Sequence, residues 1–436
     1  MLRIYARVGR LIGSSVLAVA LVSSLAHGQG LGNTPYSALG LGDMYPVGNA
    51  ANLGMGGVGI SNSNPFYLNL QNPALLATRP MATVFEVGLQ GLSRSLTQQT
   101  GTSTQNQQNA GANLGYLALA FPANPRWSMS INLRPFTYVN YATAQTQLVP
   151  GTNRTGVYTY DGSGGLNKAS FATGLKLFEK KNVYIGGEAS FLFGNITNSS
   201  SAYVALSGNG TDTQVNLLNR VNYGDIVFKL GAAWRPKLSE NWTLNLGATY
   251  DPETRVRGTQ TDIYQLTQGG SPLAVPDTAR INATGKSTLP QQIHGGISIE
   301  RNNRFTAGVD VGYQQWSRFT NTNNVNAGLL DAITTAVGLE LTPKPNSTRY
   351  RDLITYRVGA QYNQMPYEIG GARIKDMNVS AGFSLPLGRY RVNQVTMSLV
   401  YGQRGMLVPS QVREQYLRVA LGFSLADRWF IKRVID

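Results

Sequence analysis

The chain has 436 residues, of which 42% are hydrophobic and only 14% charged, and its formal net charge is +15. It contains no cysteine, which excludes a disulfide scaffold, a zinc ribbon and a thiolate enzyme. The charged fraction is far below the roughly 25% of an ordinary soluble domain, and glycine, amides and hydroxyls take its place, as they do in lumen walls and loops.

Residues 1–28 have the pattern of a secretory signal peptide. Three arginines among the first ten residues precede an apolar stretch over 11–25, and residues 26–28 place small side chains at a cleavage site. The apolar stretch is shorter than the ~20 residues of a spanning helix, which argues against an uncleaved anchor. We predict export with cleavage before Gln29. No later apolar run reaches ~18 residues, which leaves a soluble exported protein or a membrane barrel.

Residues 29–81 do not alternate, and we predict that they form a hatch or plug. Their stretch 54–59, Gly-Met-Gly-Gly-Val-Gly, formally matches a dinucleotide fingerprint, but it lacks the strand before it and the helix after it. Glycine lets a backbone approach neighbouring walls closely, as a plug inside a barrel must. The candidate hatch residues are Gly56, Gly57, Asn72, Pro73 and Ala74. Candidate ligand contacts are Phe66, Tyr67, Leu68 and Leu70, with packing against the wall as the alternative.

From residue 82 to residue 436 we predict a transmembrane β-barrel. Segments of about ten residues alternate apolar with small or polar side chains and are separated by turn residues, which is the signature of a strand. In the stretch 242–250, for example, Trp242, Leu244, Leu246, Ala248 and Tyr250 alternate with Thr, Asn, Gly and Thr. The same pattern recurs at 127–134, 183–191, 226–235, 305–314, 379–385 and 417–425.

A soluble β-sandwich alternates in the same way, because one face of each sheet is core. Two features favour the membrane. Aromatic residues sit at the ends of the apolar stripes, as in interfacial girdles, and the polar faces mix small residues with single charges, as lumen walls do. The aromatic residues are Trp127, Trp234, Trp242, Tyr250, Tyr313 and Trp316.

Connections of two lengths set the predicted topology. The stretches 120–126, 178–182, 236–241 and 300–304 predict tight periplasmic turns, whereas 94–110, 146–166, 195–222, 252–286 and 317–350 predict extracellular loops with strand extensions. A count of about 13 to 16 strands and the preference of bacterial barrels for even numbers favour 14. The final strand, Gln415–Phe430, ends in Arg-Trp-Phe, and an aromatic there suits recognition by the barrel-insertion machinery, a partner during biogenesis.

Several short motifs occur along the chain: the Met-Gly-Gly of 55–57, the Asn-Pro-Ala of 72–74, and the stretches 33–37, 40–43, 164–167, 191–194, 314–317, 385–388 and 427–433. Together they resemble the long-chain fatty acid transporter (FadL/TodX) family of outer-membrane proteins, in its Bacteroidetes-type branch. The resemblance implies an all-β, 14-stranded barrel with an N-terminal hatch, which takes up hydrophobic molecules and releases them through hatch movement or a gap in the wall. Pro135 and Pro386 are candidates for strand kinks that open such a gap, with a bulge or a strand end as the alternative.

Catalytic chemistry is not expected. His294 is the one histidine left after signal removal, and alternation turns it inward. Ser298 lies on the same face but about 13 Å away at strand rise, far beyond the ~3 Å between a base and its nucleophile; a serine from a neighbouring strand stays open. The sequence shows no zinc or calcium ligand set, so we expect no catalytic residue, cofactor or metal.

The expected function is an outer-membrane channel for fatty-acid-like hydrophobic small molecules. The alternative is a non-transporting structural or partner-binding barrel of a secretion or envelope complex, and a polar, filled lumen would favour it over a continuous apolar channel. The basic residues are scattered and not clustered with aromatics, so no nucleic-acid partner is expected. Outer-membrane lipid and lipopolysaccharide are the expected partners of the positive charge, with a basic lumen as the alternative.

Overall fold

The computed structural model describes residues 31–79, 82–101, 103–151, 154–204, 213–268, 271–273, 277–302, 304–388, 392–408 and 411–427. The predicted signal peptide and the motif Arg428-Trp429-Phe430 lie outside the described residues. No helix in the described ranges is long and apolar enough to cross a membrane.

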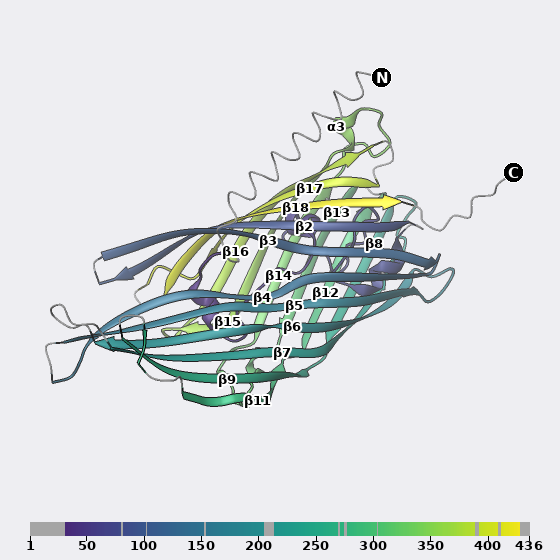
Figure 1. Ribbon diagram of the computed structural model, residues 1–436. Coiled ribbons are helices and arrows are strands. Elements are labelled where there is room, and N and C mark those ends of the chain that lie inside the picture. Colours follow the sequence, from purple (N-terminus) through teal and green to yellow (C-terminus); the bar gives the residue numbers. More distant parts are fainter. Residues whose placement is uncertain are drawn as a thin grey trace, which may run out of the picture.

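Fourteen antiparallel strand passes close into a barrel (Figure 1). The strands of the wall are β2 (Thr83–Thr100), β3 (Ser103–Asn124), β4 (Trp127–Leu148), β5 (Thr155–Lys176), β6 (Val183–Val204), β7 (Thr213–Trp234), β8 (Trp242–Asp251), β9 (Thr254–Gln268), β11 (Asp277–Leu289), β12 (Gln292–Arg301), β13 (Phe305–Gln314), β14 (Ala332–Leu341), β15 (Thr355–Ile369), β16 (Ala372–Leu387), β17 (Asn393–Arg404) and β18 (Val412–Asp427). The last strand pairs with the first, from Val412 opposite Gln98 to Asp427 opposite Thr83.

Two of the passes are broken by proline. The strands β8 and β9 follow one another along β7, with Pro252 between them. In the next pass, β11 pairs with β9 and β12 with β8, and Pro290 lies between β11 and β12. Proline has no backbone N–H to give to a ladder, so the pairing stops there and the chain continues as a second strand. The two-residue β10 (Ser271–Pro272) pairs with the end of β9.

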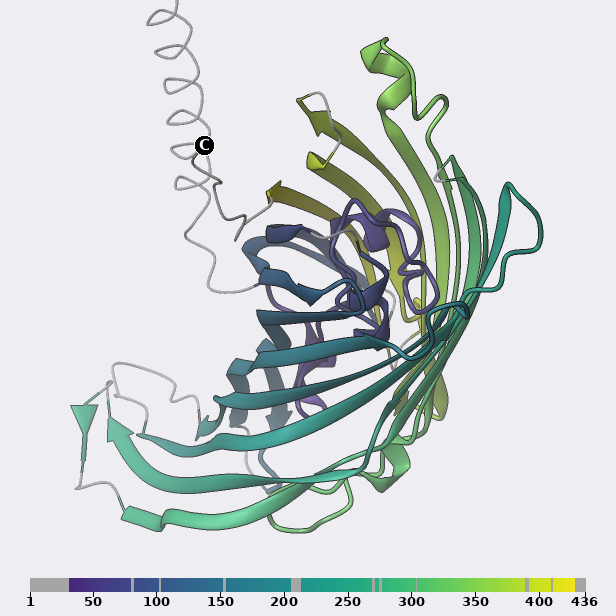
Figure 2. The same ribbon diagram turned by 90° about the vertical axis from the view of Figure 1, so that its right-hand side faces the viewer.

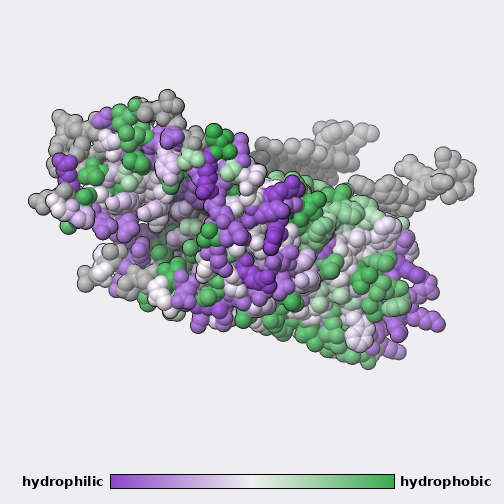
Figure 3. Space-filling view, turned by 90° about the horizontal axis from the view of Figure 1, so that it is seen from below, coloured by the Kyte–Doolittle hydropathy of each residue, from purple (hydrophilic) through white to green (hydrophobic). Residues whose placement is uncertain are grey.

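The alternation predicted from the sequence is confirmed as an inside–outside alternation. On β4, Ile131 is 54% exposed on the outer face, whereas its neighbour Ser130 is 1% exposed and points inward. A largely hydrophobic zone covers the right half of the surface in Figure 3 and is bounded by hydrophilic side chains on both sides. Such a band is what a hydrocarbon layer demands of a barrel's exterior.

The two ends of the barrel differ in the way that the connection lengths predicted, with two corrections. The stretches predicted as tight turns connect β3 to β4, β5 to β6, β7 to β8 and β12 to β13 at one end. At the other end, much of what was predicted as loop is strand: β2 and β3 almost meet at 100–103, and β9 and β11 fill most of 252–286. The range 317–350 was wrongly taken as a single loop, because it contains β14, which runs to the tight-turn end and leads there to α3 (Tyr350–Leu353).

The strands β3 and β4 separate halfway along their length. Their last paired residues are Leu117 and Leu133; beyond this point β3 pairs only with β2, while β4 pairs with β5. The separation lies next to a register shift between Pro135 and Thr137 in the pairing of β4 with β5. A bulge of this kind also bends its strand, so the predicted kink at Pro135 and its alternative, a bulge, occur together. Pro386, the other candidate, lies near the end of β16 and stays paired with β17.

Residues 31–79, called the inner segment below, lie inside the ring of strands (Figure 2). The segment contains the 3-10 helices η1 (Pro35–Ala38) and η2 (Pro73–Thr78), the helix α2 (Ala50–Gly54) and the strand β1 (Asp43–Met44). Its apolar side chains form clusters with inward-facing residues of the wall, and β1 pairs with β4. The core of the protein is therefore the contact between the inner segment and the wall.

Candidate functional site

Glycines on the inner face of the wall let the inner segment approach closely. A side chain at Gly359 of β15 would meet the backbone of Met55 at 2.2 Å, and one at Gly247 of β8 would meet the carbonyl oxygen of Ile60 at 2.1 Å. The wall glycines Gly174, Gly186, Gly231 and Gly338 have backbone or side-chain atoms of the same segment at 2.3 to 2.6 Å from such a position. Backbone thus packs on backbone, which only glycine permits.

Asparagines hold the fold of the inner segment itself. Asn49 and Asn52 form a reciprocal capping box at the start of α2, in which each side chain accepts from the other's backbone N–H. Asn72 caps η2 by accepting from the backbone N–H of Ala74 and also donates to the carbonyl oxygens of Ile60 and Ala232. These amides satisfy buried backbone groups in a segment with little regular structure of its own.

Carboxylates of the wall bind the backbone of the inner segment. Asp310 of β13 accepts from the N–H groups of Gly59 and Ile60 at 2.7 and 2.8 Å, and Glu86 of β2 accepts from the N–H of Leu68 at 2.8 Å. Such charge-assisted bonds are about twice as strong as neutral ones.

Wall serines add further bonds to the same segment. The hydroxyl of Ser380 on β16 donates to the carbonyl oxygen of Gly54 and accepts from the N–H of Gly56. The hydroxyl of Ser398 on β17 donates to the carbonyl oxygen of Ala50 at 2.7 Å. The inner segment is therefore attached to strands on several sides of the lumen.

A buried group of charges joins β1 to the wall, and we call Asp43, Arg94, Asp376, Arg404 and Glu414 the latch. Asp43 of β1 lies 2.9 Å from Arg404 and 3.7 Å from Arg94; Arg404 also pairs with Asp376 at 3.1 Å, and Arg94 with Glu414 at 3.3 Å. These side chains are between 1% and 7% exposed. Because removal of one partner leaves a buried charge without compensation, the latch makes the position of β1 costly to change.

Two tyrosines of the inner segment keep their hydroxyl groups neutral to high pH. Burial raises the pKa of Tyr36 to about 12, and its hydroxyl donates to the carbonyl oxygen of Val412. Burial also raises the pKa of Tyr67 well above its usual value, and the Tyr67 hydroxyl accepts from the side-chain amide of Asn62. Their ionisation would place an anion in the core.

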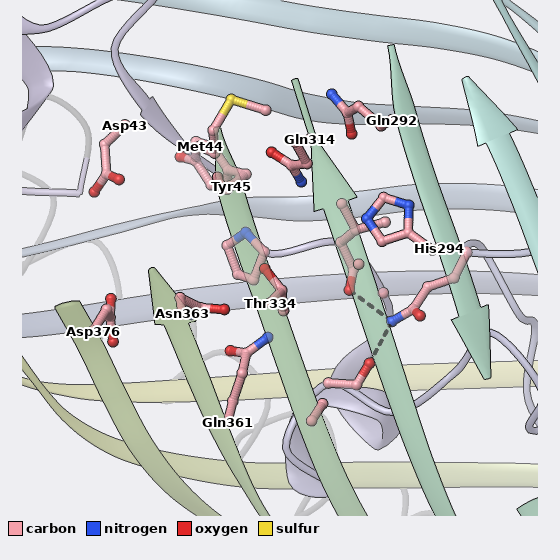
Figure 4. Close-up of a pocket in the computed structure, with 18 of the residues that line it drawn as sticks. Asp43, Met44, Tyr45, Gln292, His294, Gln314, Thr334, Gln361, Asn363 and Asp376 are labelled. Carbon is pink, nitrogen blue, oxygen red and sulfur yellow. Dashed lines mark hydrogen bonds between the residues drawn. The ribbon is translucent and has the colours of Figure 1, made fainter. Parts of the chain in front are cut away.

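A cavity of about 240 Å³ lies between the inner segment and the wall (Figure 4). Its lining is mixed: Met44, Leu53 and Ile60 face it together with charged and amide side chains. The charged and amide residues are Asp43, Gln71, Arg134, Lys168, Lys229, Asp251, Gln292, Asp310, Gln314, Gln361, Asn363, Gln364, Asp376, Asn378, Arg404 and Arg418. The cavity therefore has a mixed lining and is not bounded by apolar side chains alone.

The predicted site residues fall in two places. The candidate hatch residues contact the wall: Gly56 meets β15, where a side chain would come within 2.7 Å of the backbone of Ala360, and the stretch 72–74 packs on β6 and β7. Of the candidate ligand contacts, Leu70 lines the cavity. Tyr67 and Leu68 are fully buried, Phe66 is half-buried, and none of these three lines the cavity.

His294 faces the cavity from β12, as alternation predicted. Its Nδ1 has no hydrogen-bond partner among the described residues, and Ser298 is bonded to Asn245 instead. A search of the described part of the chain for three or more metal-binding side chains in one group finds none. Sequence reasoning missed the latch: Asp43 stood in the motif stretch 40–43 without an assigned role, and its four partners belong to strands far apart in the chain and lie in no motif.

The closed barrel, its apolar outer band and the segment bonded inside it define a membrane-type β-barrel whose lumen holds the N-terminal part of the described chain. Solved structures with this fold include the CymD monoaromatic hydrocarbon channel, with 14% identity, a TM-score of 0.58 and coverage of 88% of this chain and 98% of that one. The Pseudomonas putida toluene transporter TodX has 13% identity and a TM-score of 0.56, covering 89% and 100%. The Ralstonia pickettii toluene transporter TbuX has 14% identity and a TM-score of 0.55, covering 87% and 98%. The fold expected from the FadL/TodX resemblance is thereby confirmed.

The chain belongs to the BamG family, whose sequence profile matches residues 11–436. A comparison with curated proteins finds no match. Assignment to a Bacteroidetes-type branch stays a prediction.

Proposed function

We propose that the protein is a sealed outer-membrane barrel that serves as a partner-binding component of the β-barrel assembly machinery. The observation that carries the proposal is the attachment of the inner segment, which wall carboxylates, wall serines and the latch hold from several sides. A lumen occupied by such polar contacts suits a structural part better than a conduit for apolar solutes, because each contact would have to break and re-form for every passage.

The choice of complex rests on the family. BamG carries the naming prefix of the barrel assembly machinery, and a barrel that no longer conducts retains an extensive surface for protein contacts. In this proposal residues 1–28 direct export, residues 29–81 form the plug, and the apolar band lies in the outer membrane among lipid and lipopolysaccharide.

Two measurements test the proposal. Affinity purification of the tagged protein in mild detergent is expected to yield the central subunit of the machinery in fixed proportion, and depletion in cells is expected to slow the folding of newly exported barrels, read as heat-modifiable mobility. The purified protein is expected to give no conductance in planar bilayers. Normal folding of client barrels after full depletion would contradict the proposal.

A second candidate function is the passage of hydrophobic small molecules, the activity that the names of the similar solved proteins give to those proteins. The cavity and the separation of β3 from β4 favour it, since together they place a pocket beside an interruption of the wall. Mass spectrometry of lipophilic molecules that co-purify in detergent tests this alternative, and replacement of Leu70 by Asp is then expected to reduce their amount. Phe66, Tyr67 and Leu68 enter this alternative only if the inner segment moves.

A further inference from the structure

The outer parts of β3 and β4 have edges that no strand of the barrel covers. Beyond Leu117 and Leu133, β3 continues with β2 as its one strand partner, and β4 continues with β5 and, at Thr137 and Tyr138 alone, with the short β1 of the inner segment. In Figure 1, β2 and β3 leave the wall apart from β4 and β5 on the left of the view. Each uncovered edge presents backbone N–H and carbonyl groups in the spacing that another strand would pair with.

The base of this gap already holds an extended piece of chain. The carbonyl oxygen of Asn33 accepts from the side-chain amide of Asn109 on β3 at 3.0 Å, and the backbone N–H of Thr34 donates to the carbonyl oxygen of Asn140 on β4 at 2.8 Å. Slightly lower, β1 pairs with Thr137 and Tyr138 of β4. A single piece of backbone therefore spans the gap at this level, bonded directly to the backbone of β4 and through the side chain of Asn109 to β3.

Above this level the edges of residues 103–108 on β3 and 141–148 on β4 remain uncovered, and we call them the slot. The slot sequences are Ser-Thr-Gln-Asn-Gln-Gln and Tyr-Ala-Thr-Ala-Gln-Thr-Gln-Leu, without a charge or a proline. Except for the half-buried Tyr141, all of these side chains are exposed. Natural sheets protect exposed edges with charges, prolines or bulges, because an unprotected edge recruits another strand.

The strand β11 pairs with β9 on one side, and its other edge, which has no ladder partner in the wall, is protected. Asp277, Arg280 and Lys286 place charges along it, and the register shifts twice between Thr278 and Ala283. The connection between β13 and β14 also covers it, since the backbone N–H of Thr288 and the hydroxyl of Ser287 both donate to the carbonyl oxygen of Thr320. The slot has none of these devices in the described residues, so its open edges differ in kind from that of β11.

We propose that the slot receives one extended strand of a partner protein, which completes the wall between β3 and β4 by backbone pairing. The occupant is a short polar, uncharged segment, because the slot lies in the polar half of the strands and offers amide and hydroxyl side chains to either face of an added strand. The inference rests on the proposed function, in that the partner is a component of the assembly machinery exposed on the outer side of the membrane.

The absence of cysteine from the chain allows a direct test. Single variants Gln107→Cys and Thr143→Cys in the slot, and Thr284→Cys on the protected β11 edge as the matched control, are labelled in intact cells with benzophenone maleimide and illuminated, so that the photoactivated group inserts into a C–H bond of whatever chain lies beside it. Both slot variants are expected to give an adduct with the same short segment of one identified component of the machinery, and the control is expected to give none. Adducts of equal yield at Thr284→Cys would overturn the proposal.

Two other occupants would show themselves as different products. A homodimer adduct from the single variants would mean that a second copy of the chain fills the slot. A disulfide within one chain of the double variant Gln107→Cys/Thr143→Cys, formed in most molecules, would mean that β3 and β4 close on each other. Either product, in place of a partner adduct, refutes the proposal.

A charge placed on both edges separates the slot from the proposed function. The variant Gln107→Lys/Thr143→Lys is expected to fold with unchanged heat-modifiability, because both side chains are exposed, and to lower the yield of the slot partner at least about tenfold. If the wild-type chain co-purifies with the machinery and the lysine variant does so equally, the slot is wrong and the proposed function stands. If the wild-type chain does not co-purify with the machinery, the proposed function is wrong. In that case an adduct between the slot variants and some other protein would still support the slot as a binding site for a strand.

Discussion

The half of the barrel at the tight-turn end and the half that extends beyond it are built from the same strands, yet they use their interiors differently. In the first half every wall strand is paired on both sides, and wall glycines and carboxylates bind the inner segment, whereas the latch holds β1 beyond the level at which β3 and β4 part. In the second half the strands run on as extensions, and β3 and β4 part. We expect the pairing of every strand on both sides to contribute most of the stability of the fold. The extended half contributes less and leaves strand edges and side-chain faces free to contact other molecules.

The largest effect that tests this comparison is expected from Asp43→Asn. The substitution removes the carboxylate shared by Arg94 and Arg404, so that each buried arginine loses one of its two ion-pair partners, and we expect a loss of about 3 kcal/mol in the free energy of unfolding. Urea titration of the protein in lipid vesicles measures it. The control is Glu179→Gln, which removes an exposed ion pair with Arg126 and is expected to change little. Equal effects of the two variants would contradict a special role of the latch.

A smaller loss is expected from Gly359→Ala. The added methyl group would meet the backbone of Met55 and force the inner segment or the wall to shift, at a cost of about 1–3 kcal/mol. Gly295→Ala on β12 is the matched control, because its side-chain position has nothing within 4 Å. The same urea titration compares them, and an inner segment held loosely would make the two variants indistinguishable.

A pH-dependent effect follows from Tyr36. Its pKa in the folded protein, about 12, lies above the usual value of 10, so the unfolded chain loses this proton first and stability falls as pH rises from 10 to 12. At pH 11 this one group accounts for about 1 kcal/mol. In Tyr36→Phe the loss of stability between pH 9 and pH 11 is expected to be smaller by that amount, although the variant is weaker at neutral pH because a hydrogen bond is gone. An unchanged alkaline slope would show that Tyr36 is accessible to water in the folded state.

The smallest effect is expected in the extended half. Gln107→Lys changes an exposed side chain on an uncovered edge, so the free energy of unfolding of the isolated protein is expected to change by less than about 0.5 kcal/mol. A loss comparable to that of Gly359→Ala would mean that the outer edge of β3 contributes to the stability of the isolated barrel.

The sequence predicted the wall well because its physics is local. Alternation such as that of 127–134 needs only the two-residue period of a strand and a membrane on one side, and it placed Ser130 inside and Ile131 outside. Turn residues likewise located the tight end. The loops were over-predicted because Asn, Thr and Gln in stretches such as 94–110 are compatible with strands once each strand has a paired neighbour.

The candidate site was less accessible to prediction because its contacts are not local. The glycines of 54–59 indicated a close approach of backbones, but not that the approach would be to Gly359 and Gly338 of the wall. The carboxylates of Asp310 and Glu86 appeared as single charges on lumen faces, and their roles depend on which N–H groups the folded chain brings to them. No spacing in the sequence encodes such pairings.

The inner segment is made first but can be seated only late. Its Thr34 donates to Glu414, 380 residues further along, and its Ala50 accepts from Ser398, 348 residues away. Loop closure over such distances has to wait until the last strands exist. Closure of the barrel and insertion of the inner segment are therefore coupled at the end of biogenesis. A barrel that has not reached this stage would have an open lumen, with the inner segment still outside it.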